Sequence, residues 1–132
     1  MAEILGSVSA SIHLTEKLIK YCRAFKSATV DAANLAEEVA AVGHALQTLQ
    51  ESIENPPRGL SFPKTSSLSA SIRNCERRMR VLETSLAPHA SRFRNLLKRA
   101  KWPLRQQETA EAVQALHRFV QIFHYATTSD GL

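Results

Sequence analysis

Basic side chains gather in one part of the chain, and they are the residues whose spacing most clearly predicts chemistry. Between Arg73 and Arg105 the formal charge is +8, whereas the whole chain carries +5, so the remainder carries −3. A cationic patch of this kind attracts phosphate groups, on an anionic lipid surface or on nucleic acid. The alternative is a solvated helix face without a ligand. The candidate contacts with anionic lipid are Arg92, Arg94, Lys98, Arg99 and Lys101.

The aromatic residues in the basic segment argue against nucleic acid as the partner. Nucleic-acid binding usually places aromatic or base-reading side chains beside a basic patch. The segment contains Phe93 and Trp102 alone, and both are typical of packing residues. We therefore expect no nucleic-acid partner, and a nucleic-acid-binding bundle is the third of the functions considered.

Catalytic and metal-binding patterns are missing from the sequence. No two of the five histidines are spaced i,i+4 as in a helical zinc site, and the cysteines, Cys22 and Cys75, do not form a Cys-x-x-Cys pair. The sequence also has no glycine-rich phosphate loop and no Gly-x-Ser-x-Gly elbow. We therefore predict no enzymatic activity, cofactor or metal, and we expect the cysteines to be buried free thiols in a reducing compartment.

The elements that carry these residues are helices. Hydrophobic residues make up 44% of the 132 residues, enough for one domain with a core. Apolar residues recur every three or four positions, prolines and glycines interrupt these runs, and short loops predict antiparallel neighbours. The pattern predicts an all-α, antiparallel four-helix bundle with an additional short helix before the last long helix; a long coiled coil is the rival fold. The expected long helices cover about residues 3–25, 31–54, 65–86 and 103–127, and the short helix covers 91–101.

The boundaries follow from helix-breaking residues. Ala87-Pro88 is expected to end the third long helix, and Pro103 is expected to start the last one, with Glu108 near its positive end. Trp102 is then expected to fill the corner between the short helix and the last helix, so Trp102 and Pro103 are predicted to be structural. Residues 1–127 form one domain in this interpretation, and residues 128–132 form a tail.

The first helix is the second functional candidate. Its longest stretch without a formal charge runs from Ile4 to Thr15, shorter than the roughly 20 apolar residues of a membrane-spanning helix. Such a segment can lie in a membrane interface or line a pore in an oligomer. The alternative is simply the first helix of the bundle. The N-terminus does not have the pattern of a signal peptide, so we expect a cytoplasmic protein.

Several segments together resemble the HeLo-like N-terminal domains of fungal NOD-like (STAND) receptors. They are the opening over residues 1–25, the heptad helix that ends near Ile53, the Cys75-Glu76 pair, and the W-P-[LF]-[KR]-x-x-E-[TV] motif at Trp102–Thr109. The resemblance covers nearly the whole chain, and the last motif is its most specific part. It implies a helical bundle that executes regulated cell death and is distantly similar to the bundle of the necroptosis pseudokinase.

The resemblance implies a mechanism. Oligomerisation releases the N-terminal helix, the protein relocates to the plasma membrane, and the helix permeabilises it. The partners would be anionic membrane lipids, further copies of the chain, and an upstream receptor or amyloid-signalling protein. The alternative is a non-lytic adaptor or oligomerisation module of a signalling receptor. The residues expected to insert, with Glu3 matching an acidic residue of the family, are Glu3, Ile4, Leu5, Val8 and Ile12.

Overall fold

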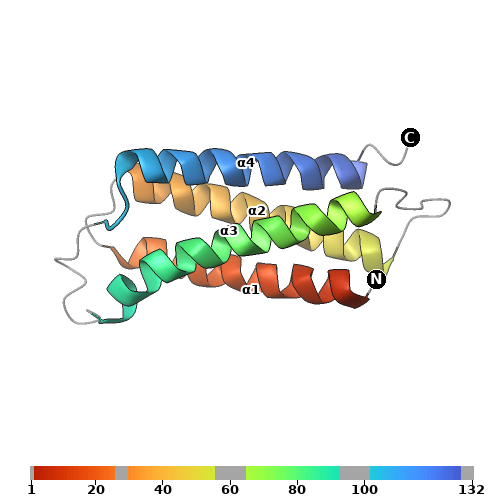
Figure 1. Ribbon diagram of the computed structural model, residues 1–132, viewed down its shortest axis with the longest axis horizontal. Coiled ribbons are helices and arrows are strands. Elements are labelled where there is room, and N and C mark those ends of the chain that lie inside the picture. The colour runs from red at the N-terminus through yellow and green to blue at the C-terminus, as the bar shows by residue number, and fades with distance from the viewer. Residues whose placement is uncertain (1, 26–29, 56–64, 93–101, 129–132) are drawn as a thin grey trace.

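The fold is all-helical over the residues that the structure describes. A computed structural model describes residues 2–25, 30–55, 65–92 and 102–128. These ranges contain four helices and no strand, which confirms the all-α prediction. The helices are α1 (Ala2–Ala24), α2 (Val30–Glu54), α3 (Thr65–Arg92) and α4 (Gln106–Thr128), drawn in Figure 1.

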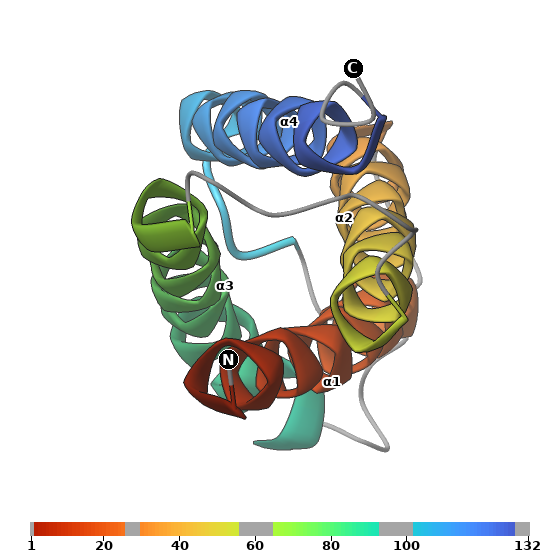
Figure 2. The ribbon, with the colours of Figure 1, turned by 90° about the vertical axis from the view of Figure 1, so that its right-hand side faces the viewer.

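The order of the helices around the bundle is not their order in the chain. α1 packs against α2 and α3, α2 also packs against α4, and the contact between α3 and α4 is the smallest of the four. Figure 2 shows the resulting ring, in which α2 and α3 lie diagonally opposite. Consecutive helices run in opposite directions, so the neighbours α1 and α3 run the same way, as do α2 and α4 (Figure 1). These two neighbouring pairs differ from the predicted antiparallel packing, because α3 follows α2 in the chain but lies diagonally across the ring from it.

The core consists of one apolar stripe from each helix. On α2 every residue of the predicted stripe is buried, from Leu35 to Ile53. The apolar stripe of α3, from Leu68 to Leu86, is buried and repeats every three or four residues in the same way. α4 contributes fewer fully buried residues. The apolar repeats of the sequence predict seven core residues, Leu46, Leu49, Ile72, Met79, Leu82, Leu116 and Val120. All of them are buried except Val120, which is only partly buried.

α1 and α2 approach each other closely at Gly43. A Cβ atom at this position would lie 2.8 Å from Thr15 Oγ1 and 3.4 Å from Thr15 Cβ. The first distance is below van der Waals contact, so glycine is required here by the packing of α1. Thr15 is itself buried, which limits its freedom to move aside.

Both helix boundaries predicted from prolines are wrong. α3 continues through Pro88 to Arg92. A proline removes only one backbone hydrogen bond, here to the carbonyl of Thr84, so a helix can bend there and continue. Figure 1 shows the last turn of α3 leaving the main helix axis. α4 begins at Gln106 rather than Pro103. The predicted short helix overlaps the end of α3 at residues 91–92, and its residues 93–101 lie outside the described part of the chain.

The start of α4 is determined by a partial capping box. The backbone N–H of Arg105 donates to Glu108 Oε1 at 3.1 Å, and the Arg105 carbonyl accepts from the N–H of Thr109 at 2.9 Å. Arg105 therefore occupies the cap position and Glu108 the third helical position. The negative charge of Glu108 lies in the first turn, where it also interacts favourably with the helix dipole.

The Gly43 contact generates a stability prediction. Gly43→Ala should destabilise the fold by about 1–3 kcal/mol because the new methyl group overlaps Thr15 Oγ1. In a Thr15→Ala background the same change should instead stabilise it, by up to about 1 kcal/mol, because alanine is the better helix former. Urea unfolding of the four proteins in this double-mutant cycle measures both effects. Equal effects of Gly43→Ala in the two backgrounds would show that the helices do not touch here.

Candidate functional site

The residues predicted to insert into membranes lie on α1, and in this structure two of them belong to the core. Ile4 and Val8 are buried, whereas Leu5 and Ile12 are partly buried and pack against the same core. Glu3 lies in α1, but the structure does not describe its side chain. The segment predicted to insert therefore packs against the core of the bundle in this structure.

The buried face of α1 contains two hydroxyl groups, those of Ser11 and Thr15. Ser11 is 0% exposed, and its hydroxyl has no hydrogen-bond partner within the described part of the chain. One turn later, the buried Thr15 hydroxyl donates to the carbonyl of Ile12 at 2.6 Å. A buried hydroxyl without a partner costs about 1–3 kcal/mol. The packing of α1 on the bundle is thus weakened by its own sequence.

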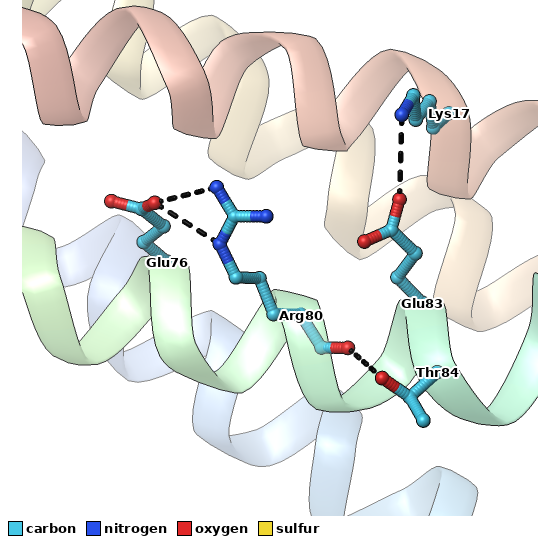
Figure 3. Close-up of polar contacts among 5 residues, drawn as sticks. All are labelled: Lys17, Glu76, Arg80, Glu83 and Thr84. Atoms are coloured by element: carbon cyan, nitrogen blue, oxygen red, sulfur yellow. Dashed lines mark hydrogen bonds and ion pairs between the residues drawn. The ribbon is translucent and has the colours of Figure 1, made fainter.

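Polar contacts link α1 to α3. Ser7 Oγ donates to Glu76 Oε1 at 2.7 Å, and the other carboxylate oxygen of Glu76 accepts from Arg80 Nη2 at 2.9 Å. Further along, Lys17 Nζ lies 3.5 Å from Glu83 Oε2. Figure 3 shows the two carboxylates of α3 beside α1, one paired within its own helix and one paired with α1. Exposed ion pairs contribute little to stability, so these contacts position α1 more than they hold it.

The surroundings of Glu76 shift its pKa. Burial alone would raise the pKa, but the hydrogen bonds from Ser7 and Arg80, together with the charge of Arg80, outweigh that effect. The pKa of the Glu76 carboxyl therefore lies below its ordinary value of 4.5. A carboxyl with a depressed pKa stabilises the folded state above its unfolded pKa, and this contribution is lost as the pH falls.

A basic face occupies the outer side of α3. Arg73, Arg77 and Arg80 line a hollow of about 400 Å³ together with Glu76, Val81 and Thr84. The Thr84 hydroxyl donates to the carbonyl of Arg80 at 2.9 Å (Figure 3). The selection of lipid contacts from the sequence omitted these arginines, although their spacing of four and three residues is the signal for one helix face.

Most of the predicted lipid contacts lie outside the residues that the structure describes. Arg92 is the last residue of α3, but its side chain is not described. Arg94, Lys98, Arg99 and Lys101 lie in the range 93–101, outside the described residues. Their relation to the arginines on the outer side of α3 therefore stays a prediction.

Trp102 connects α1 and α4 at one end of the bundle. Its ring makes an edge contact with Phe25, with ring centroids 5.4 Å apart and planes at 89°, and its Nε1 donates to Thr109 Oγ1 at 3.0 Å. The Thr109 hydroxyl in turn donates to the Arg105 carbonyl at 3.1 Å. Trp102 therefore joins the residue that follows α1 to the first turn of α4. Pro103, predicted to begin α4, precedes the helix and is partly buried.

The thiols and the helix lengths bear on other functions. Burial raises the pKa of Cys22 to about 11, and burial with the neighbouring charge of Glu76 raises the pKa of Cys75 to about 12. Both thiols are therefore protonated at neutral pH and unreactive. Among the described residues, no cluster of three or more potential metal ligands occurs. In the same residues, no helix is both long enough and apolar enough to cross a bilayer.

Comparisons with known proteins identify no relative. The chain matches no known protein family, and neither a curated protein nor a solved structure is significantly similar to it. The resemblance to HeLo-like domains therefore rests on the sequence motifs alone.

The Ser7–Glu76 hydrogen bond can be tested through pH. Ser7→Ala should raise the pKa of Glu76 toward its ordinary value, because one donor to the carboxylate is lost. The variant should then lose less stability than the native protein between about pH 5 and pH 3. An NMR titration of the Glu76 side chain and urea unfolding across this range measure the two effects, with Ser67→Ala on exposed α3 surface as the control. An unchanged Glu76 pKa in Ser7→Ala would contradict the contact.

The Trp102 contacts predict a difference between two substitutions. Trp102→Ala should cost about 3–5 kcal/mol because it removes the ring from Phe25. Trp102→Phe should cost less, about 1–2 kcal/mol, since it keeps an aromatic ring beside Phe25 and loses the hydrogen bond to Thr109 and part of the indole. Urea unfolding of both variants measures the two free-energy changes. A similar small cost for both would show that the Trp102 ring does not stabilise the fold.

Proposed function

We propose that this domain is a membrane-targeting, oligomerising effector of regulated cell death or innate immunity, in which α1 leaves the bundle to permeabilise a membrane. The observation that carries the proposal is the polar packing of α1. Its buried face contains the Ser11 hydroxyl, which has no partner among the described residues, and its contact with α3 includes the Ser7–Glu76 hydrogen bond. A helix packed in this way gains less from the bundle than its apolar residues would allow.

The energetics require a second apolar environment for α1. Full exposure of a buried aliphatic side chain such as Ile4, Val8 or Leu18 costs about 1.5–3 kcal/mol each, so α1 does not leave the bundle freely in water. A bilayer interface offers those side chains apolar surroundings again. The uncharged stretch from Ile4 to Thr15 is too short to span a bilayer alone. It suits an interfacial position or the wall of an oligomeric pore.

The approach to the membrane is electrostatic in this proposal. The basic segment that ends near Arg105 carries most of the positive charge of the chain, and each cation near an anionic surface contributes about 1 kcal/mol. The protein would wait in the cytoplasm and relocate to the plasma membrane when an upstream receptor or an amyloid-signalling partner brings copies together. Arg92, Arg94, Lys98, Arg99 and Lys101 are the proposed lipid contacts.

A second candidate is a non-lytic adaptor or oligomerisation module. The observation that favours it is the depth of α1, which packs on both α2 and α3 and contributes Leu14, Leu18 and Cys22 to the core as well as Ile4 and Val8. In that function α1 is a permanent part of the fold. The two candidates therefore differ in whether α1 moves.

A reversible lock on α1 distinguishes the candidates. The Cβ atom built at Gly43 lies 3.4 Å from Thr15 Cβ, close to the roughly 3.5–4.5 Å found in disulfides. Oxidation of Thr15→Cys/Gly43→Cys should therefore fix α1 to α2 without removing any core residue. We expect dye leakage from phosphatidylserine vesicles to be lost in the oxidised protein and to return on reduction, because release of α1 is then possible again.

The lock has matched controls. Thr15→Cys alone, treated with the same oxidant and reductant, should permeabilise vesicles in both states. Leakage by the oxidised double variant would show that α1 stays docked during permeabilisation. An absence of leakage by the native protein and by the reduced variant would favour the adaptor.

A further inference from the structure

A groove between α2 and α4 is rich in carboxylates. It has a volume of about 680 Å³, and Asp31, Glu37 and Glu38 of α2 lie along one wall. His117 of α4 is the one basic side chain among the described lining residues, with its Nδ1 3.5 Å from Glu38 Oε1. Asp31 and Glu37 have no ion-pair partner within the described residues. The groove therefore carries uncompensated negative charge.

The wall of this groove on α4 is partly apolar. Val113 and Val120 are only partly buried and line it beside the carboxylates. A partner that fits the groove must therefore bring positive charge together with an apolar side chain.

The outer face of α3 has this combination. Arg73 and Arg77 have no ion-pair partner within the described residues, and Arg80 is paired only with Glu76 of the same helix. Val81 lies among these arginines and is 59% exposed. α3 thus presents cations around an unburied aliphatic side chain.

The geometry points to a second copy of this chain as the occupant of the groove: we propose that the α3 face of one molecule, formed by Arg73, Arg77, Arg80 and Val81, docks into the α2/α4 groove of the next. α3 and α2 lie on opposite sides of the ring in Figure 2, so one molecule can use both surfaces at once. Contacts between two different surfaces produce head-to-tail rings or filaments rather than closed two-fold dimers.

This interface gives a structural form to the self-association step of the proposed function. Its role in cells rests on that function, but the docking itself does not. Several charge pairs across one interface mainly increase association rate and specificity, and salt weakens them. Burial of Val81 against Val113 and Val120 would add apolar contact that salt does not screen. Because the proposed interface consists of protein side chains alone, the assembly can be tested in solution without lipid.

A charge exchange tests the docking. Arg77→Glu and Glu37→Lys should each weaken self-association of the full chain at low salt by roughly tenfold or more, because each places like charges across the interface. An equimolar mixture of the two variants should associate again, since each variant supplies the surface that the other lacks. Sedimentation velocity over a range of protein concentrations measures all three, and about 1 M salt, with a Debye length near 3 Å, should weaken the native assembly.

Arg118→Glu is the matched control, because Arg118 is an exposed arginine of α4 that does not line the groove. It should leave the association constant unchanged. The proposal is overturned if the native chain stays monomeric at low salt, if Arg118→Glu weakens association equally, or if the mixture fails to recover. Loss of vesicle binding by Arg77→Glu with unchanged self-association would overturn it as well, in favour of a lipid contact. Vesicle leakage by a chain that stays monomeric would reject this interface and leave the release of α1 intact.

Discussion

The close approach of α1 and α2 at Gly43 is the contact on which the rest of the structure depends. Because position 43 has no side chain, Thr15 can enter the interface and bring the apolar stripe of α1 into the core. One turn earlier on α1, the buried Ser11 hydroxyl has no partner among the described residues. α1 is therefore packed closely on α2, and yet its buried face contains a polar group that weakens this packing.

α1 has two neighbours with different chemistry. Its closest approach to α2 is at Thr15 and Gly43, whereas its contact with α3 includes the Ser7–Glu76 hydrogen bond and the Lys17–Glu83 ion pair. Polar contacts exchange for contacts with water at little net cost. The buried apolar side chains of α1 therefore oppose its separation more than these two polar contacts do.

The sequence predicts the core well and the arrangement less well. The stripes from Leu35 to Ile53 and from Leu68 to Leu86 are regular because buried helix faces repeat every three or four residues, and the structure buries them. Periodicity does not encode which helices are neighbours, so the position of α3 beside α1 was not predictable in this way. Pro88 misled the prediction because the loss of one hydrogen bond need not end a long packed helix.

The candidate site was predictable only in part. The uncharged stretch from Ile4 to Thr15 singles out α1. The burial of Ser11 without a partner among the described residues, and the ring contact between Trp102 and Phe25, depend on long-range packing. The arginines on the outer face of α3 were within reach, since Arg73, Arg77 and Arg80 share one helix face by spacing alone. The acidic groove was not, because its walls come from α2 and α4.

Native-state hydrogen exchange tests most directly whether α1 can separate from the bundle. In the native protein without lipid, the amides of α1 should exchange through an opening of lower free energy than the amides of α2. Addition of phosphatidylserine vesicles should change the protection of α1 much more than that of α2, because α1 exchanges its contacts in the bundle for contacts with the membrane. Equal protection of the two helices, with and without vesicles, would show that α1 opens only when the whole domain unfolds, and would contradict the account.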